Sequence, residues 1–118
     1  MIYTSPFPKI EIPITPLHEY LFEHADKWAE KPALIDGPTG RSFTYTELRN
    51  AITAVAAGLG SRGFKTGDVF AIFSPNIPEY AVAFFGVSTA GGVNTTINPL
   101  YTAEEVKRQL IDSTASFL

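Results

Sequence analysis

The sequence predicts an α/β fold: a three-layer α-β-α arrangement with a mostly parallel sheet, preceded by an extended arm, a helix and a short hairpin. Two observations lead to this prediction. From Thr44 onward, helical patterns alternate with short apolar strands, which is typical of βαβ units with right-handed crossovers. The run VFAIF at 69–73 has no polar alternation, as expected for a strand covered on both faces. The chain has 118 residues, of which 45% are hydrophobic, so it is long enough for one domain with its own core.

Residues 1–15 are predicted to form the arm. Four prolines fall within the first sixteen residues, and proline fixes φ and removes a hydrogen-bond donor. A helix is expected to begin at Thr15-Pro16, with Thr15 as the cap, and to end before Pro32. Its apolar face consists of six residues at helical spacing, namely Leu17, Tyr20, Leu21, His24, Ala25 and Trp28.

A hairpin and a longer helix are expected next. The segments ALID and RSFTY flank the turn GPTG at 37–40, whose residue types favour a tight connection. Thr44 and Glu47 have the spacing of a capping box, which predicts a helix start. An apolar stripe follows (Leu48, Ile52, Val55, Ala56 and Leu59), and two glycines offer left-handed C-caps (Gly60 and Gly63).

The second half of the chain predicts further alternation. We expect a largely buried helix at 77–90, a strand at 93–97, a helix opened by the Thr102–Glu105 capping box, and a strand beginning in ASFL at 115–118. The last helix is expected to point three residues inward (Val106, Leu110 and Ile111) and to carry an outward Glu104–Arg108 pair.

Two strand-to-helix corners are the most distinctive segments. In SPNIPEY, 74–80, Asn76 is expected to cap the helix, with Pro78 in the first turn and Glu79 closing a capping box. The segment NPLYTAEE repeats this arrangement after the next strand. Because parallel strands end at one edge of a sheet, both corners are expected on the same side, where ligand crevices of such sheets lie.

Composition excludes several classes of function. The net charge is −3 and the nine basic residues are scattered, which argues against nucleic-acid binding. The absence of cysteine excludes disulfides and cysteine nucleophiles. No apolar stretch reaches the roughly 18 residues of a membrane span, and no secretory signal is evident, so a soluble intracellular protein is expected.

Candidate chemical residues have simpler structural interpretations. GLGSRG, 58–63, matches a dinucleotide motif but ends a helix, whereas phosphate binding requires the start of one. His18 and His24 lie six residues apart, which does not place them together on a helix face. The remaining candidates lie in turns or outside nucleophile motifs (Ser74, Ser88, Asp36 and Asp68). The sequence therefore predicts no catalytic, cofactor-binding or metal-binding residue.

Four segments, in this order and spacing, resemble the N-terminal portion of adenylate-forming acyl-CoA synthetases. They are FTYTEL, GFKTGDV, SPNIPEYAVAFFGVSTAGGVNTTINPLYTAEEV and STA. The resemblance covers the chain from about Leu17 and is nearest to the branch with 4-coumarate–CoA ligase-like, luciferase-like and long-chain acyl-CoA ligases. It implies that 16–118 is the N-terminal α/β subdomain of an AMP-binding domain, truncated at its C-terminal end.

The resemblance also implies a reaction. In that family a carboxylic acid and Mg·ATP form an acyl-adenylate, and coenzyme A then displaces AMP. The phosphate loop, the ribose-binding aspartate and the catalytic lysine of the family lie downstream of Leu118, and Lys65 belongs to a turn. Six residues that match the family are framework there: Asn76, Pro78, Glu79, Asn98, Pro99 and Tyr101.

We therefore expect a segment of an ATP-, Mg- and CoA-dependent ligase, acting on an aromatic or fatty acid and inactive by itself. The rest of the polypeptide is expected to cover Phe117 and Leu118, which would otherwise be exposed beside an open sheet. A cytoplasmic location is expected, with a peroxisomal one open because such signals are C-terminal. Three alternatives remain: a stand-alone flavodoxin-like binding module, an adenylation domain that feeds a carrier protein, and a luciferase-like monooxygenase.

Overall fold

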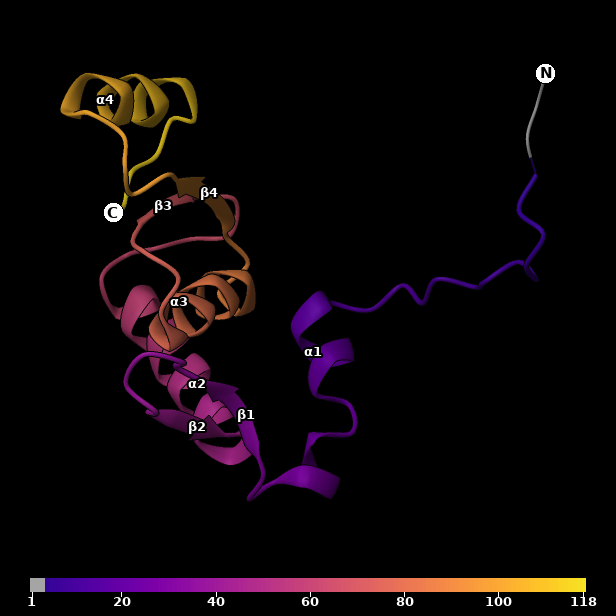
Figure 1. Cartoon of the computed structure of the whole chain (residues 1–118). Coiled ribbons are helices and arrows are strands. Elements are labelled where there is room, and N and C mark those ends of the chain that lie inside the picture. The colour runs from indigo at the N-terminus through magenta and orange to yellow at the C-terminus, as the bar shows by residue number, and fades with distance from the viewer. Residues whose placement is uncertain (1–3) are drawn as a thin grey trace.

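The computed structural model describes residues 4–118 and has the α/β class that the sequence predicts (Figure 1). Residues 4–15 contain no helix or strand and are exposed, and residues 1–3 of the expected arm lie outside the described residues. The elements are α1 (Leu17–Phe22), the 3-10 helix η1 (Ala25–Trp28), β1 (Pro32–Ile35), β2 (Ser42–Thr44), α2 (Tyr45–Ser61), β3 (Val69–Phe73), α3 (Pro78–Thr89), β4 (Val93–Ile97) and α4 (Ala103–Asp112).

The single helix expected from Thr15 onward is wrong. The chain forms only six residues of α-helix and then a separate 3-10 turn, with His24 at the break. Pro16 is the N-cap, and no side chain caps this helix. The reason is packing: α1 buries none of its residues, and a short helix without a buried face is marginally stable.

The hairpin is confirmed. β1 and β2 pair antiparallel, with Ile35 opposite Ser42 and an irregularity in the register between Pro32 and Leu34. The turn between them is closed by two main-chain hydrogen bonds that involve Asp36: its N–H donates to Arg41 O at 2.8 Å, and its carbonyl accepts from Gly40 N at 2.7 Å.

Helix α2 begins at the predicted capping box. Thr44 Oγ1 accepts from Glu47 N at 3.1 Å, and Glu47 Oε2 accepts from Thr44 N at 2.8 Å. The helix ends at Arg62, and Gly63 takes a left-handed conformation with φ of 86°. Gly60 lies inside the helix, so its predicted role as a left-handed cap is wrong. The helix keeps its own hydrogen-bond ladder through Gly60 and needs left-handed backbone only after Arg62.

Strands β3 and β4 pair in parallel, from Val69 opposite Val93 to Phe73 opposite Ile97. On the other side of β3, the chain end begins a third parallel position, where Phe117 O accepts from Ala71 N at 2.8 Å. The strand predicted in ASFL is thus present as a single bridge. Ala71 and Ile72 are consecutive and both buried, which confirms that β3 is covered on both faces.

Helices α3 and α4 lie on opposite faces of this strand pair (Figure 1). The amide of Asn94 donates to Phe84 O of α3 at 3.0 Å, whereas Thr95 Oγ1 accepts from Gln109 of α4 at 3.1 Å. Successive strand residues point to opposite faces, so these two bonds connect the two faces to different helices. Helix α2 packs on α3 beyond this unit.

The core lies mainly between α2 and α3. One cluster contains Leu48, Ile52 and Val82, and a second contains Leu59, Phe64 and Val87. Val87 is fully buried, and no residue of α3 is fully exposed, as its apolar sequence predicts.

Helix α4 begins at the predicted box, with Glu105 Oε2 accepting from Thr102 N at 2.8 Å. Two expectations about its faces fail. Ile111 is 68% exposed, because the sheet beneath α4 is narrow and the half-buried Val106 and Leu110 already cover it. In the part of the chain that the structure describes, Glu104 and Arg108 do not form an ion pair, since both remain in solvent, where such pairs contribute little.

Candidate functional site

The two predicted corners lie at the same edge of the parallel strand pair. Phe73, the last residue of β3, is opposite Ile97, the last residue of β4. The chain leaves both strands on this carboxyl-end side, and the two connections run on into α3 and α4. This confirms the expected placement, at the edge where sheets of this type form ligand crevices.

The first corner is built differently from the prediction. Ile77 is the N-cap of α3, no side chain caps it, and Pro78 occupies the first turn as expected. Asn76 therefore does not cap the helix. Glu79 does not close a box, and both of its oxygens accept from Arg41 of the hairpin, at 2.7 Å and 3.2 Å.

The later start of the helix explains this change. With Ile77 as the N-cap, Glu79 is the second residue of α3 and does not have the spacing of a capping box, and its carboxylate pairs with Arg41 of the hairpin. The hydrogen bond from Arg41 holds the pKa of Glu79 below its ordinary value, and the pKa of Arg41 is raised in turn. The pair joins the end of the hairpin turn to the start of α3.

The second corner keeps the predicted local chemistry. Asn98 Oδ1 accepts from Leu100 N at 3.0 Å, and the Thr102 capping box opens α4. The corners are therefore alike in position but not in hydrogen bonding. Tyr101 is partly exposed at this corner.

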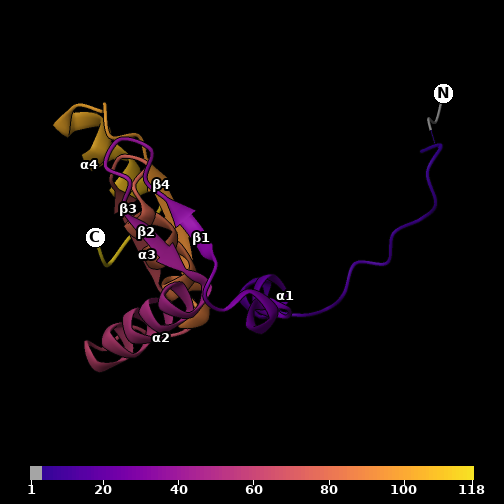
Figure 2. The same cartoon turned by 60° about the horizontal axis from the view of Figure 1, so that its bottom comes forward.

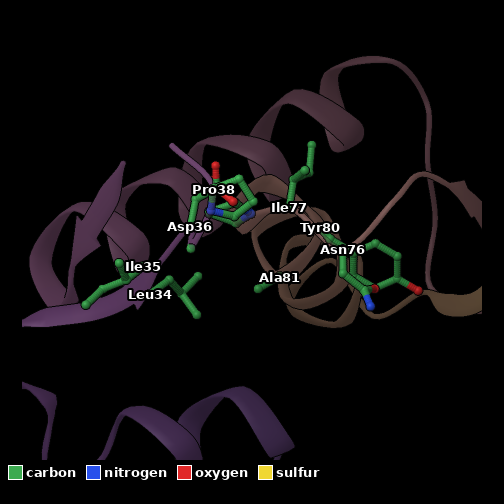
Figure 3. A pocket seen from close by; sticks show the side chains of 10 residues that line it. Leu34, Ile35, Asp36, Pro38, Asn76, Ile77, Tyr80 and Ala81 are labelled. Carbon is green, nitrogen blue, oxygen red and sulfur yellow. The ribbon is translucent and has the colours of Figure 1, made fainter. Parts of the chain in front are cut away.

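An open hollow of about 310 Å³ lies between the hairpin and the first corner (Figure 3). Its polar side chains are Asp36, Asn76 and Tyr80. Asp36 accepts from the hydroxyl of Thr39 in the hairpin turn, which confirms its interpretation as a turn residue. The other lining residues are Leu34, Ile35, Gly37, Pro38, Ile77, Pro78 and Ala81. A mostly apolar, shallow hollow of this kind can seat a neighbouring apolar segment.

The remaining candidates take structural positions. The glycines of GLGSRG lie in the last turns of α2 and just beyond it, at the negative end of the helix dipole. Asp68 Oδ2 accepts from Lys65 N at 2.7 Å, so both residues belong to one turn. The hydroxyls of Ser74 and Ser88 donate to main-chain carbonyls at 3.0 Å and 2.9 Å.

The histidines also lie apart. His18 is on α1, and His24 stands between α1 and η1. Within residues 4–118, no three His, Asp or Glu side chains gather in a group that could hold a metal ion. We derive no metal-dependent step from the described residues. That this segment contains no catalytic, cofactor-binding or metal-binding residue stays a prediction.

Residue-level reasoning missed three side chains that organise the corners and the sheet. Arg41 binds Glu79, Asn94 holds β4 to α3, and Gln109 reaches Thr95 and the Thr96 carbonyl from α4. These bonds join residues 38, 10, 14 and 13 positions apart in the sequence. The only local signal was the polar character of Asn94 within a predicted strand.

The chain end is partly covered. Phe117 was expected to be exposed, but its ring stands edge-on to Phe64 with centroids 5.1 Å apart, and it is half-buried. Phe70 and Phe117 both pack against the cluster of Leu59, Phe64 and Val87, a contact that the sequence around either ring does not reveal. Leu118 is 69% exposed, as predicted.

Comparison with known proteins agrees with this geometry. A family model described as "AMP-binding enzyme" matches residues 21–118. The chain is 41% identical to 4-coumarate–CoA ligase 1 of Petroselinum crispum over 119 residues, which covers 100% of the chain and 22% of the relative. It is 42% identical to 4-coumarate–CoA ligase 3 of Arabidopsis thaliana, covering 99% of the chain and 21% of the relative.

Solved structures show the same fold. A benzoate CoA ligase from Burkholderia xenovorans LB400 superposes with a TM-score of 0.80 and 30% identity, over 86% of the chain and 20% of that structure. The anthranilate CoA ligase AuaEII superposes with a TM-score of 0.81 at 24% identity, over 88% of the chain and 20% of that structure. The fold and its two corners define an α/β segment of adenylate-forming enzymes. The chain belongs to the AMP-binding enzyme family.

The chain spans about a fifth of the length of the curated relatives that it matches. None of the helices within residues 4–118 is long and apolar enough to cross a membrane.

Proposed function

We propose that this chain is the N-terminal subdomain of an ATP-dependent carboxylic acid–CoA ligase. The observation that carries the proposal is identity of 40% or more to several 4-coumarate–CoA ligases along essentially the whole chain. In the complete enzyme, the acid and ATP form an acyl-adenylate and pyrophosphate, and coenzyme A displaces AMP to give the thioester. Mg²⁺ accompanies ATP in this reaction.

The role proposed for this segment is structural. Its buried α2–α3 core and its parallel strands form a scaffold, and the remainder of the polypeptide packs on it. The exposed apolar residues at the carboxyl-end side support this role, since Phe73 and Leu118 are 44% and 69% exposed there. Contiguous exposed apolar surface is typical of an interface.

The proposed substrate is an aromatic or fatty carboxylic acid. Relatives and neighbours in structure carry the names of 4-coumarate, benzoate and anthranilate ligases. An aromatic acid is therefore the first substrate to test. A cytoplasmic location, and a peroxisomal one as its alternative, stay predictions.

The test is acid-dependent exchange of labelled pyrophosphate into ATP, followed by thioester formation with CoA. A ligase that contains this segment is expected to catalyse both steps with 4-coumarate, benzoate or a fatty acid, and to lose the first step when Mg²⁺ is chelated. The chain of 118 residues by itself is expected to catalyse neither. Pyrophosphate exchange by that chain alone would overturn the scaffold role.

One outcome would favour a different second step. A fused adenylation–PCP protein containing NpsA superposes with a TM-score of 0.74 at 25% identity. If the ligase forms adenylate but passes the acyl group to a carrier protein and not to CoA, the segment belongs to an adenylation domain. The higher identity to CoA ligases makes thioester formation with CoA the expected result.

A further inference from the structure

The N-terminal arm contains a sequence pattern typical of a β-strand, but it forms no strand in the structure. Isoleucine occupies every second position between 10 and 14, and polar residues or proline stand between them. In extended backbone, such alternation places all three isoleucines on one face. Ile10, Ile12 and Ile14 are 81%, 85% and 106% exposed, so this face covers nothing within the described chain.

The prolines make the arm competent for pairing along one edge only. In a strand, the N–H and C=O groups of alternate residues point to the same edge. One edge carries the main-chain groups of the three isoleucines, and between Pro8 and Pro16 all of its N–H donors are present. The opposite edge lacks a donor at Pro13. Within residues 4–118, no hydrogen bond engages the main chain of these isoleucines.

Helix α1 continues the same apolar surface. Leu17, Tyr20 and Leu21 follow at helical spacing and are 57%, 56% and 49% exposed. A hollow of about 340 Å³ lies between the arm and α1, and Ile10, Ile12, Leu17 and Tyr20 line it. The arm and helix therefore form one unpartnered apolar surface.

The arm does not reach a sheet edge of its own chain. Both views show it leading away from the body, on the side of α1 and far from β3 and β4 (Figures 1 and 2). The radius of gyration is 17.0 Å, compared with about 13–14 Å for a compact chain of this length. A partner sheet must come from outside the described residues.

We propose that residues 10–14 add as an edge strand to a β-sheet contributed by the remainder of the same AMP-binding polypeptide, with the exposed side of α1 packing beside them. This inference rests on the proposed function, in which this chain is one segment of a longer enzyme. The relatives are about five times longer than the chain, so most of such a domain lies beyond it. A sheet on the same polypeptide is presented at an effective concentration that reaches the millimolar range for short flexible linkers, which favours it over a second copy.

Strand addition of this kind binds through main-chain hydrogen bonds and uses alternate side chains for specificity. The edge with all its N–H donors supplies the main-chain hydrogen bonds, and the three isoleucines supply the alternate side chains. The charges of the arm, Lys9 and Glu11, are opposite in sign and lie on the face away from the isoleucines, so they do not oppose burial of that face.

Residue-resolved hydrogen exchange of the ligase that contains this segment tests the inference. The amides of Ile10, Ile12 and Ile14 are expected to exchange at least about tenfold more slowly than those of Lys9 and Glu11, because paired amides exchange only after local opening. Ile12→Pro removes a donor on the pairing edge and is expected to abolish this protection at Ile10 and Ile14. Glu11→Pro, on the other edge, is the matched control and is expected to preserve it.

Ile12→Ala separates the two contributions, because it keeps the N–H and removes most of the side chain. Partial loss of protection is expected. Equally fast exchange at all five positions would overturn the inference, as would equal effects of the two proline variants. Protection that disappears when the ligase is diluted would also overturn it, because the occupant would then be a second copy.

Failure of the proposed function has a different signature. A polypeptide that shows alternating protection but no pyrophosphate exchange with any acid would contradict the ligase proposal and support the arm pairing. An active ligase whose arm amides are unprotected would support the ligase proposal and contradict the arm pairing. A polypeptide that ends at Leu118 would overturn both.

Discussion

Gly86 of α3 lies against Val55 of α2 with no room for a side chain. A Cβ atom built at Gly86 would stand 2.5 Å from Val55 Cγ1 and 2.8 Å from its Cβ. Real side chains do not approach this closely, so the glycine sets how near the two helices pack. These two helices enclose most of the core, so a larger side chain at this contact is expected to lower the stability of the fold.

Gly86→Ala is expected to destabilise the protein by about 1–3 kcal/mol, the usual range for overpacking a core. Urea denaturation measures the change. The added Val55→Ala substitution is expected to recover part of the loss, because the two residues share one contact and their effects are not additive. Gly60→Ala is the control: nothing lies within 4 Å of its Cβ position, and alanine favours a helix, so no loss is expected.

Thr44→Ala and Thr102→Ala are each expected to cost about 1 kcal/mol of stability, because each removes the oxygen that caps a helix N-terminus. Serine at either position keeps that oxygen and is expected to restore most of the loss. Urea midpoints of the parent, the alanine variant and the serine variant at each position provide the comparison. If alanine and serine behave alike, the boxes do not contribute to stability.

Ile52→Ala is expected to destabilise by about 2–5 kcal/mol, since Ile52 is 4% exposed within the α2–α3 core and its loss leaves a cavity. Ile111→Ala removes the same atoms from an exposed site and is expected to change stability by less than about 0.5 kcal/mol. Thermal or urea unfolding compares them directly. A large effect at Ile111 would mean that another surface covers it.

Stability is expected to fall in acid as three carboxylates become protonated. Hydrogen bonds from the Thr44 main chain, the Arg41 side chain and the Thr102 main chain lower the pKa values of Glu47, Glu79 and Glu105. A carboxylate whose pKa is lower in the folded state stabilises the fold above its unfolded pKa of about 4.3, and this contribution is lost as the pH falls through the folded value.

Glu79→Gln tests the pH effect at one site. The variant is expected to be slightly less stable at neutral pH and to lose less stability than the parent between neutral pH and about pH 3, because its side chain no longer titrates. Urea midpoints measured across this range give the comparison. Glu104→Gln removes an exposed carboxylate from the corresponding position in the first turn of α4 and serves as the control for the loss of charge alone. Parallel profiles for Glu79→Gln and the parent would contradict the role of Arg41.

Local patterns predicted local structure well. The two threonine capping boxes, the hairpin, and the strands at 69–73 and 93–97 all form, because each depends on residues a few positions apart. The Asn76–Glu79 box had an equally good local pattern and failed. The helix begins one residue later, with Ile77 as its N-cap, and the carboxylate pairs with Arg41, which only the tertiary fold brings near.

The first helix failed for the opposite reason. Of its expected apolar face only Ala25 is buried, whereas Phe22, outside that face, packs on the core beside Phe85, and spacing alone does not sustain a longer helix. The order and spacing of the two corner segments indicated the family. The hydrogen bonds that fix these corners could not be predicted from the sequence. Arg41, Asn94 and Gln109 bond to residues of other elements, ten or more positions away, and no periodicity marks such residues.

The place of β3 between β4 and the chain end has a consequence for the order of synthesis. The hairpin and α2 come from adjacent residues, so they can pair as soon as they leave the ribosome. β3 receives β4 later, and its other edge stays open until Phe117 has been made. The strand at the centre of the sheet is thus the last to gain both neighbours, and a nascent chain that pauses before Phe117 presents an apolar strand with one bare edge.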